Sequence, residues 1–157
     1  FAPFFAYLWI FLGKRNLDPN MPVKFAIGLF LMALGFIVMI FAIKFALVSS
    51  PVGIQWLLIT YLLHTFGELT LSPVGLSAFS KYSPKRYLGQ MMGIWFLASS
   101  LGGVLAGLLG GEATELGLES MSPVFTELVY YCIAIAAVLL SLSFFIKGAK
   151  SETNSIK

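Results

Sequence analysis

Charged residues are scarce in this sequence. They make up 11% of its 157 residues, whereas hydrophobic residues make up 59%, and the mean hydropathy is +0.91. A soluble domain has about 25% charged and about 45–50% apolar residues. The composition therefore excludes a soluble protein and predicts an integral membrane protein. The single cysteine, Cys132, excludes an intramolecular disulfide, so cysteine usage gives no information on the redox compartment.

Patterns of catalytic residues are also missing. The sequence has no paired carboxylates, no histidines and cysteines at metal-binding spacing, no G-x-S-x-G elbow and no phosphate-binding loop. Nothing in it resembles a selectivity filter or a repeated ring of charge. These absences argue against an intramembrane enzyme and against a channel. We accordingly predict no catalytic residue, no metal site, no bound cofactor and no nucleic-acid partner.

Long uncharged runs are what the sequence has instead. A membrane-spanning helix needs about 20 mostly apolar residues. Runs of this kind, separated by loops with glycine, proline, serine and charge, predict an all-α transmembrane fold. The expected helices cover about 1–12, 23–47, 54–80, 87–111 and 124–147, followed by a tail over 148–157. Because the first run is short and has no polar flank, we expect the sequence to be a piece of a longer protein.

The basic residues predict an orientation. Nine of the ten lie in or beside alternate loops or in the tail: Lys14, Arg15, Lys24, Lys81, Lys85, Arg86, Lys147, Lys150 and Lys157. Lys44 alone lies beside an intervening loop. Loops rich in lysine and arginine stay in the cytoplasm. The pattern thus predicts a cytoplasmic C-terminus and places the acidic loop over 111–127 outside.

Glu68 is the one acid at mid-depth in a predicted helix. A charge in the bilayer core costs about 2.5–3.5 kcal/mol, so such residues usually face a bundle interior or a water-filled cavity. Helical spacing places five residues on its face: Tyr61, His64, Thr65, Ser72 and Gly75. We interpret this polar stripe as facing a cavity, and a static ion pair between helices is the alternative. For His64, a proton relay and a bond to a neighbouring backbone or threonine both stay open.

Pro73 lies just beyond Glu68 in the same helix. Its ring removes a backbone N–H and clashes with the carbonyl of Leu69, which predicts a kink. We expect Thr70 or Ser72 to satisfy the freed carbonyl, as polar side chains do in membrane helices. A kink beside a buried acid suggests a gate that bends, and a static kink is the alternative.

The predicted helix over 87–111 carries small residues four apart, which in lipid favour close helix packing. They are Gly89 and Gly93, then Ser99, Gly103, Gly107 and Gly111. Trp95 and Phe96 interrupt this pattern at mid-depth, with Ser99 one turn beyond Trp95. Tryptophan is normally found at membrane interfaces. We therefore interpret Trp95 as lining a pocket or filling the bundle core.

One long segment carries a resemblance to a known family. FGELTLSPVGLSAFSKYSPKRYLGQMMGIWFLASSLGG, over 66–103, resembles the tenth and eleventh helices of the proton-dependent oligopeptide transporters, within the major facilitator superfamily. The upstream stretches FFAYLW, FLGKR and KFAIGL resemble helices eight and nine. The resemblance implies that the chain supplies helices eight to twelve, a part of the C-terminal six-helix bundle.

The resemblance also implies roles for individual residues. Glu68 matches the acid that receives the amino terminus of a peptide, and Trp95, Phe96 and Ser99 match residues of the side-chain pocket. We add Ser72 to the substrate site from its place on the Glu68 face, and we assign the gate to Pro73. The implied function is proton-coupled symport of di- and tripeptides into the cell.

The setting that the resemblance implies is the plasma membrane, which is the inner membrane in bacteria. The expected partners are peptides, protons as the coupling ion, the lipid bilayer and an N-terminal bundle of the same protein. That bundle would carry the family's E-x-x-E-R-F-x-Y-Y motif, which this sequence lacks. Two alternatives stay open: a facilitator of another solute, such as nitrate, a drug or an amino acid conjugate, and a structural membrane subunit.

Overall fold

The computed structural model describes residues 2–15, 19–48, 52–115 and 117–155. Five α-helices and one 3-10 turn make up these ranges: α1 (Ala2–Lys14), α2 (Met21–Val48), α3 (Gln55–Tyr82), η1 (Lys85–Tyr87), α4 (Leu88–Glu115) and α5 (Leu118–Ser155). No strand occurs in the described part of the chain. The predicted all-α fold is therefore confirmed.

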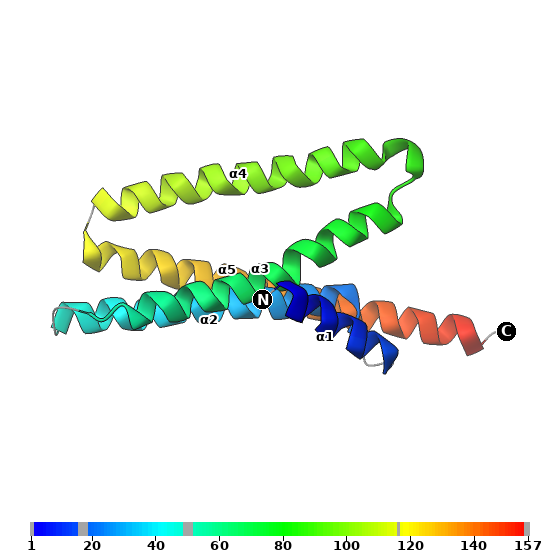
Figure 1. Cartoon of the computed structure of the whole chain (residues 1–157), viewed down its shortest axis with the longest axis horizontal. Coiled ribbons are helices and arrows are strands. Elements are labelled where there is room, and N and C mark those ends of the chain that lie inside the picture. The colour runs from blue at the N-terminus through cyan, green and yellow to red at the C-terminus, as the bar shows by residue number, and fades with distance from the viewer. Residues whose placement is uncertain (1, 16–18, 49–51, 116, 156–157) are drawn as a thin grey trace.

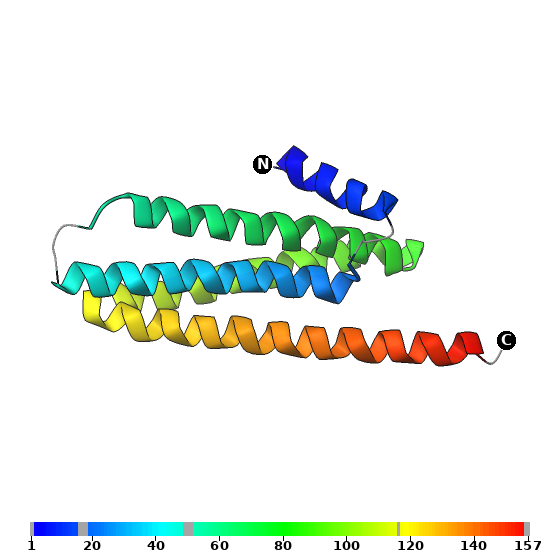
Figure 2. The ribbon, with the colours of Figure 1, turned by 90° about the horizontal axis from the view of Figure 1, so that it is seen from below.

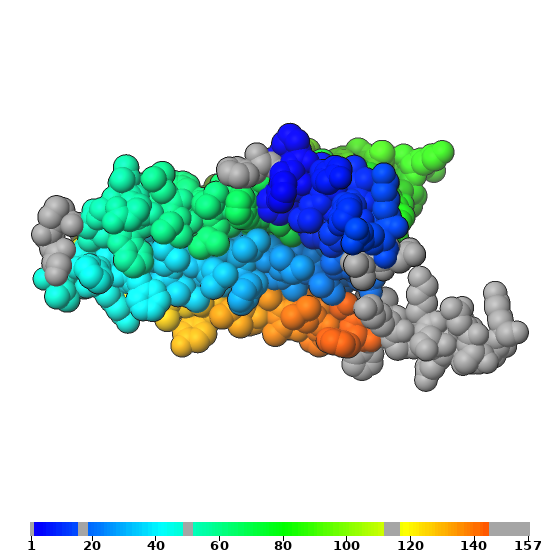
Figure 3. All heavy atoms as spheres, turned by 60° about the horizontal axis from the view of Figure 1, so that its bottom comes forward, coloured from blue at the N-terminus to red at the C-terminus, as the bar shows by residue number. Residues whose placement is uncertain are grey.

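Helix α2 is the centre of the bundle. It packs along α3 on one side and along α5 on the other, while α1 lies over α3 (Figure 1, Figure 2). The space-filling view shows α2 between these two neighbours and α1 at the surface (Figure 3). The buried residues are mostly small: Ala26, Ala33, Ala42, Ile43, Thr60, Thr70, Val74, Val129, Ala136 and Ser143. Small side chains let helices approach closely, which is how helices associate in lipid.

Two glycines bring the backbones of α2 and α3 close together. A Cβ on Gly67 would lie 2.9 Å from the carbonyl oxygen of Gly28, and a Cβ on Gly28 would lie 3.0 Å from the carbonyl oxygen of Gly67. The two backbones thus touch at a pair of facing glycines. A larger residue at either position would force the facing backbone, or the side chain of Leu71 or Met32 beside it, to shift.

Within the described ranges, three helical segments are long and apolar enough to cross a membrane: Met21–Val48, Lys85–Gly111 and Leu118–Phe144. Helix α3 is as long as α2, at 28 residues. It is not among these three because polar residues such as Glu68 and His64 lower its hydropathy. Its axis turns away from α2 in the half that contains Pro73 (Figure 1). The bend agrees with the kink expected at this proline.

The predicted loop over 111–127 is wrong. Helix α4 continues to Glu115 and α5 already begins at Leu118. Glutamate, alanine, leucine and methionine in this segment all favour helix. Gly117, with φ +92°, adopts the left-handed conformation that commonly follows a helix end. The break is therefore confined to the junction at this glycine.

Helix α5 also continues to Ser155, through most of the predicted tail over 148–157. No proline follows Phe144 to end the helix, and the polar residues there include good helix formers. The backbone thus extends beyond the apolar segment that ends at Phe144.

Candidate functional site

Glu68 lies on the exposed face of α3. Thr65 and Ser72 are exposed beside it, whereas Gly67 and Thr70 are buried on the side that faces α2. Because α2 occupies the opposite side of α3, the carboxylate points away from the centre of the described bundle. Among the described residues no ion pair to Glu68 is formed.

His64 leaves the polar stripe that the spacing predicted. Its imidazole ring lies against Gly35 of α2, so close that a Cβ on Gly35 would overlap it. The ring centroids of His64 and Phe36 are 4.7 Å apart in an edge-on arrangement. The Nε2 atom is buried and has no hydrogen-bond partner within the described ranges. The structure thus separates His64, at the α2–α3 contact, from the exposed Glu68.

Trp95 joins α4 to α3. Its indole lies against Gly75, where a Cβ would overlap the ring, and its centroid is 5.3 Å from that of Phe79 at an interplanar angle of 62°. Trp95 is half-buried by this contact. From the sequence we interpret Trp95 as lining a pocket or filling the bundle core, and in the structure it packs against a neighbouring helix. The pairing of Gly75 with Trp95 was not predicted, because nothing in a single sequence matches a glycine on one helix to an indole on another.

Phe96 and Ser99 stay exposed on α4. Phe96 has 61% of its surface accessible, and Ser99 is exposed one turn away. Helix α4 runs apart from α2 and meets α3 and α5 weakly (Figure 1). A Cβ on Gly93, Gly103 or Gly107 would meet nothing within 4 Å. Within the described residues the small-residue pattern of α4 therefore has no helix packed on it.

Pro73 is exposed on α3 and lines a cavity of about 490 Å³. The expectation that Thr70 satisfies the carbonyl freed by Pro73 is wrong, because the Thr70 hydroxyl donates to the carbonyl of Phe66 instead, at 2.8 Å. A threonine hydroxyl most easily reaches the carbonyl four residues back, which for Thr70 is Phe66.

The structure places the predicted substrate residues on two neighbouring helices, α3 and α4. Neither of the two cavities described for this chain includes Glu68, Ser72, Trp95, Phe96 or Ser99. Glu68 and Ser72 share the exposed face of α3, and Phe96 and Ser99 share α4. What the structure brings together is a pair of adjacent helices that meet at Trp95 and carry exposed polar and aromatic residues.

These features define an α-helical membrane protein with an exposed acid at mid-helix. Residues 1–118 match the model of the POT family, and the chain belongs to this family. This is the family of proton-dependent oligopeptide transporters that the motifs in 66–103 resemble. The resemblance is therefore confirmed.

Curated relatives agree with the family assignment. The chain is 41% identical over 143 residues to the peptide transporter YePEPT of Yersinia enterocolitica, covering 90% of this chain and 28% of that protein. It is 33% identical over 147 residues to dipeptide and tripeptide permease B of Aliivibrio fischeri, covering 88% and 30%. The chain thus spans less than a third of the length of these relatives.

Solved structures share the arrangement of helices. A peptide transporter POT crystallised with sulfate superposes with a TM-score of 0.78 at 33% identity, covering 92% of this chain and 28% of that one. A POT family transporter crystallised with a thioalcohol-conjugated peptide gives a TM-score of 0.76 at 30% identity, covering 93% and 29%.

Proposed function

We propose that this chain is the C-terminal part of a transporter that moves di- and tripeptides into the cell together with protons. The relatives named peptide transporter and dipeptide and tripeptide permease support the substrate class. The observation that carries the proposal is Glu68, an exposed acid on a helix that otherwise packs into a membrane bundle. An N-terminal bundle of the same protein would cover this face and enclose the acid.

A carboxylate at this depth is stable when it is protonated, paired or hydrated. A peptide carrier uses these options in turn. Without substrate, Glu68 holds a proton or pairs with a lysine across the cavity. With substrate, it pairs with the ammonium group of the peptide. The different partners bias the equilibrium between two conformations, because a ligand shifts an equilibrium by its differential interaction with the two states.

In this proposal the aromatic side of α4 binds the side chains of the peptide. Phe96 presents an exposed ring beside Ser99. Aromatic walls bind apolar surface of varied shape, which suits a carrier of many different peptides. Trp95, which packs on Gly75 and Phe79, fixes α4 relative to α3 beside Phe96.

We place the protein in the plasma membrane, with the C-terminal end of α5 in the cytoplasm. The ends of α1 and α3, the start of α2 and the end of α5 lie at one end of the bundle, and Lys44 near the end of α2 lies toward the other (Figure 1). The basic loops therefore share one side. The positive-inside rule supports a cytoplasmic assignment for that side.

The full-length protein that carries this chain tests the proposal after reconstitution into proteoliposomes. An inward proton gradient should drive accumulation of labelled dialanine, and unlabelled tripeptides should compete. Accumulation should stop when a protonophore collapses the gradient. If nitrate or an amino acid conjugate competes and peptides do not, the transported solute is not a peptide.

A further inference from the structure

The turn between α3 and α4 carries an exposed group of basic residues. Lys81, Lys85 and Arg86 lie within six positions of the chain, and all three are exposed. No ion pair involves them in the part of the chain that the structure describes. We call the segment over 81–87 the basic turn. It lies at the end of the bundle that also holds the end of α1 and the start of α2, which is the basic end (Figure 1).

The backbone of the basic turn is held by internal contacts. The N–H of Ser83 donates to the carbonyl of Phe79 at 3.1 Å, and the N–H of Tyr87 donates to the carbonyl of Pro84 at 2.9 Å. The ring of Pro84 restricts the backbone between these two bonds. A turn that is already ordered loses little conformational entropy when its side chains bind a ligand.

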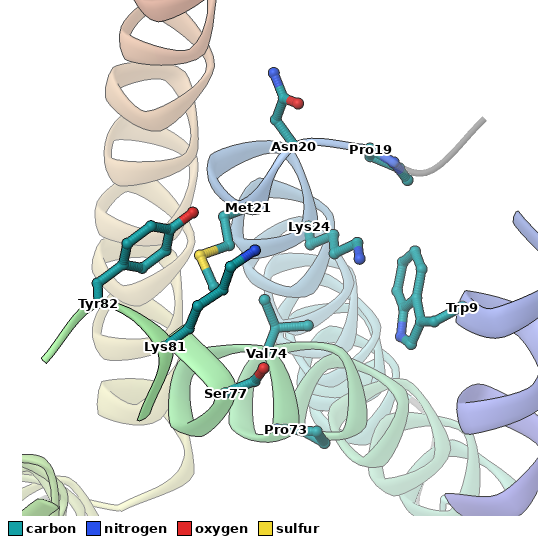
Figure 4. A pocket seen from close by; sticks show the side chains of 10 residues that line it. All are labelled: Trp9, Pro19, Asn20, Met21, Lys24, Pro73, Val74, Ser77, Lys81 and Tyr82. Carbon is teal, nitrogen blue, oxygen red and sulfur yellow. The ribbon is translucent and has the colours of Figure 1, made fainter. Parts of the chain in front are cut away.

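The basic turn also lies at the end of a membrane span, because the apolar segment of α4 begins at Lys85. Tyr82 and Tyr87 are both exposed there. The Lys81 Nζ lies 5.7 Å from the centroid of the Tyr82 ring, and the Arg86 Cζ lies 5.7 Å from that of Tyr87. In Figure 4 the side chains of Lys81 and Tyr82 extend in the same direction from the end of α3. Tyrosine at the end of a span is typical of the level of the lipid headgroups.

We propose that the basic turn binds the headgroups of anionic phospholipids. The proposal rests on the cytoplasmic side that we proposed for the basic end, because the cytoplasmic leaflet holds the anionic lipids. Headgroups with net negative charge complement three exposed cations. Phosphatidylcholine offers a phosphate too, but its choline group adds a cation that the lysines repel.

The test uses the purified full-length protein that carries this chain, in a neutral detergent. Phosphatidylglycerol and phosphatidylcholine with the same fluorescent acyl chain are each held at low concentration while the protein is titrated, and fluorescence anisotropy reports binding. Phosphatidylglycerol should bind in a saturable manner and about tenfold or more tightly than phosphatidylcholine. Added salt should weaken its binding, because salt screens exposed charges.

Three variants assign this binding to the basic turn. Lys81→Gln, Lys85→Gln and Arg86→Gln should each weaken phosphatidylglycerol binding about fivefold, the change expected for one lysine or arginine near an anionic surface. The assay involves no transport, so its outcome is independent of whether the protein carries peptides.

Two matched variants control for basic residues elsewhere. Lys14→Gln removes a cation from the end of α1, which lies apart from the basic turn at the same end of the bundle (Figure 1), and Lys44→Gln removes one near the far end of α2. Both should leave phosphatidylglycerol binding unchanged. All the substituted side chains are exposed, so none of the variants leaves a cavity in the core.

Three results would overturn the proposal. The first is equal binding of the two lipids at low salt. The second is a loss in Lys14→Gln as large as that in the turn variants, which would assign binding to the general charge of this end. The third is a lower temperature of thermal unfolding in the turn variants, measured without lipid, together with unchanged phosphatidylglycerol binding. That result would mean that the cations pair with acids of the protein itself, such as Asp18, which lies outside the described residues, or acids of the N-terminal bundle.

Discussion

Gly75 on α3 lies directly against the indole of Trp95 on α4. A Cβ on Gly75 would overlap the far edge of the ring, so alanine there forces the ring or the helix to move. Trp95 also packs on Phe79, so this contact helps to set the spacing of the two helices that carry the candidate site.

We predict that Gly75→Ala destabilises the full-length protein by about 1–3 kcal/mol, the usual cost of overpacking. Gly13→Ala is the matched control, because a Cβ on Gly13 would meet nothing within 4 Å. Thermal unfolding in detergent measures both. If the two variants unfold at the same temperature, Trp95 does not hold α4 against α3 at Gly75.

A second contact of this kind couples Gly35 of α2 to His64 of α3. Gly35→Ala should destabilise the bundle, because its Cβ would overlap the imidazole. His64→Ala in the same protein should recover part of the loss, since contacting residues show coupling of about 0.5–3 kcal/mol in double-mutant cycles. A strictly additive cycle would mean that the Cβ introduced at Gly35 does not meet the imidazole of His64.

Gly67→Ala provides the contrast. Its Cβ would approach the carbonyl oxygen of Gly28, a backbone atom, as well as the Met32 side chain. Truncation of Met32 should therefore not restore the stability lost in Gly67→Ala. Full recovery in that double variant would show that the backbones of α2 and α3 do not touch there.

Pro73 should affect the rate of transport more than the affinity for peptides. It lies where α3 turns away from α2, between the face of Glu68 and the basic end of the bundle. Lid and gate motions limit turnover in many proteins without changing ligand contacts. In Pro73→Ala we expect slower uptake with little change in peptide binding in detergent. Pro123→Ala, at a proline in the second turn of α5, is the control. Equal losses of uptake and binding in Pro73→Ala would argue against a gate.

The two neighbouring aromatic residues of α4 should behave differently. Phe96→Ala should weaken uptake of peptides with bulky apolar side chains more than uptake of dialanine, because its ring is exposed and in the proposed function binds peptide side chains. Trp95→Ala should lower thermal stability and uptake of both peptides, because its ring packs on α3. Phe144→Ala, at an exposed ring of α5, serves as control. A uniform loss in Phe96→Ala would assign that ring to packing.

Most of the fold follows from the sequence. Uncharged runs define where helices lie, because the length of a membrane span constrains them. The polar composition of the segment over 111–127 predicts a loop. Its glutamates, alanine and leucines nevertheless favour helix, and a single glycine in the left-handed conformation suffices for the turn. Polarity thus marks the end of a membrane span without marking the end of a helix.

The candidate site was less predictable. Periodicity places His64 and Glu68 on one face, but the rotation of α3 against α2 decides which of them is covered, and that depends on the facing glycines. Glu68, Phe96 and Ser99 are exposed in the described part of the chain. In the proposed function the facing walls come from the N-terminal bundle, and residues that are not in this sequence cannot be derived from it.

Glu68→Gln tests the central claim most directly. Glutamine keeps the size and hydrogen bonding of Glu68 but removes its charge, so neither a proton nor the ammonium group of a peptide can be held electrostatically. Glu127→Gln, at an exposed acid of α5, is the matched control. The measurement is uptake of labelled dialanine into proteoliposomes under an inward proton gradient, with N-acetylated dialanine as the second ligand in binding. We predict that Glu68→Gln no longer accumulates dialanine against a gradient. It should bind dialanine at least tenfold more weakly, as expected for a loss of about 1.4 kcal/mol or more of pairing energy. It should bind the N-acetylated form nearly as the wild type does. Accumulation of dialanine by Glu68→Gln at the wild-type rate would contradict this account and make Glu68 a structural acid.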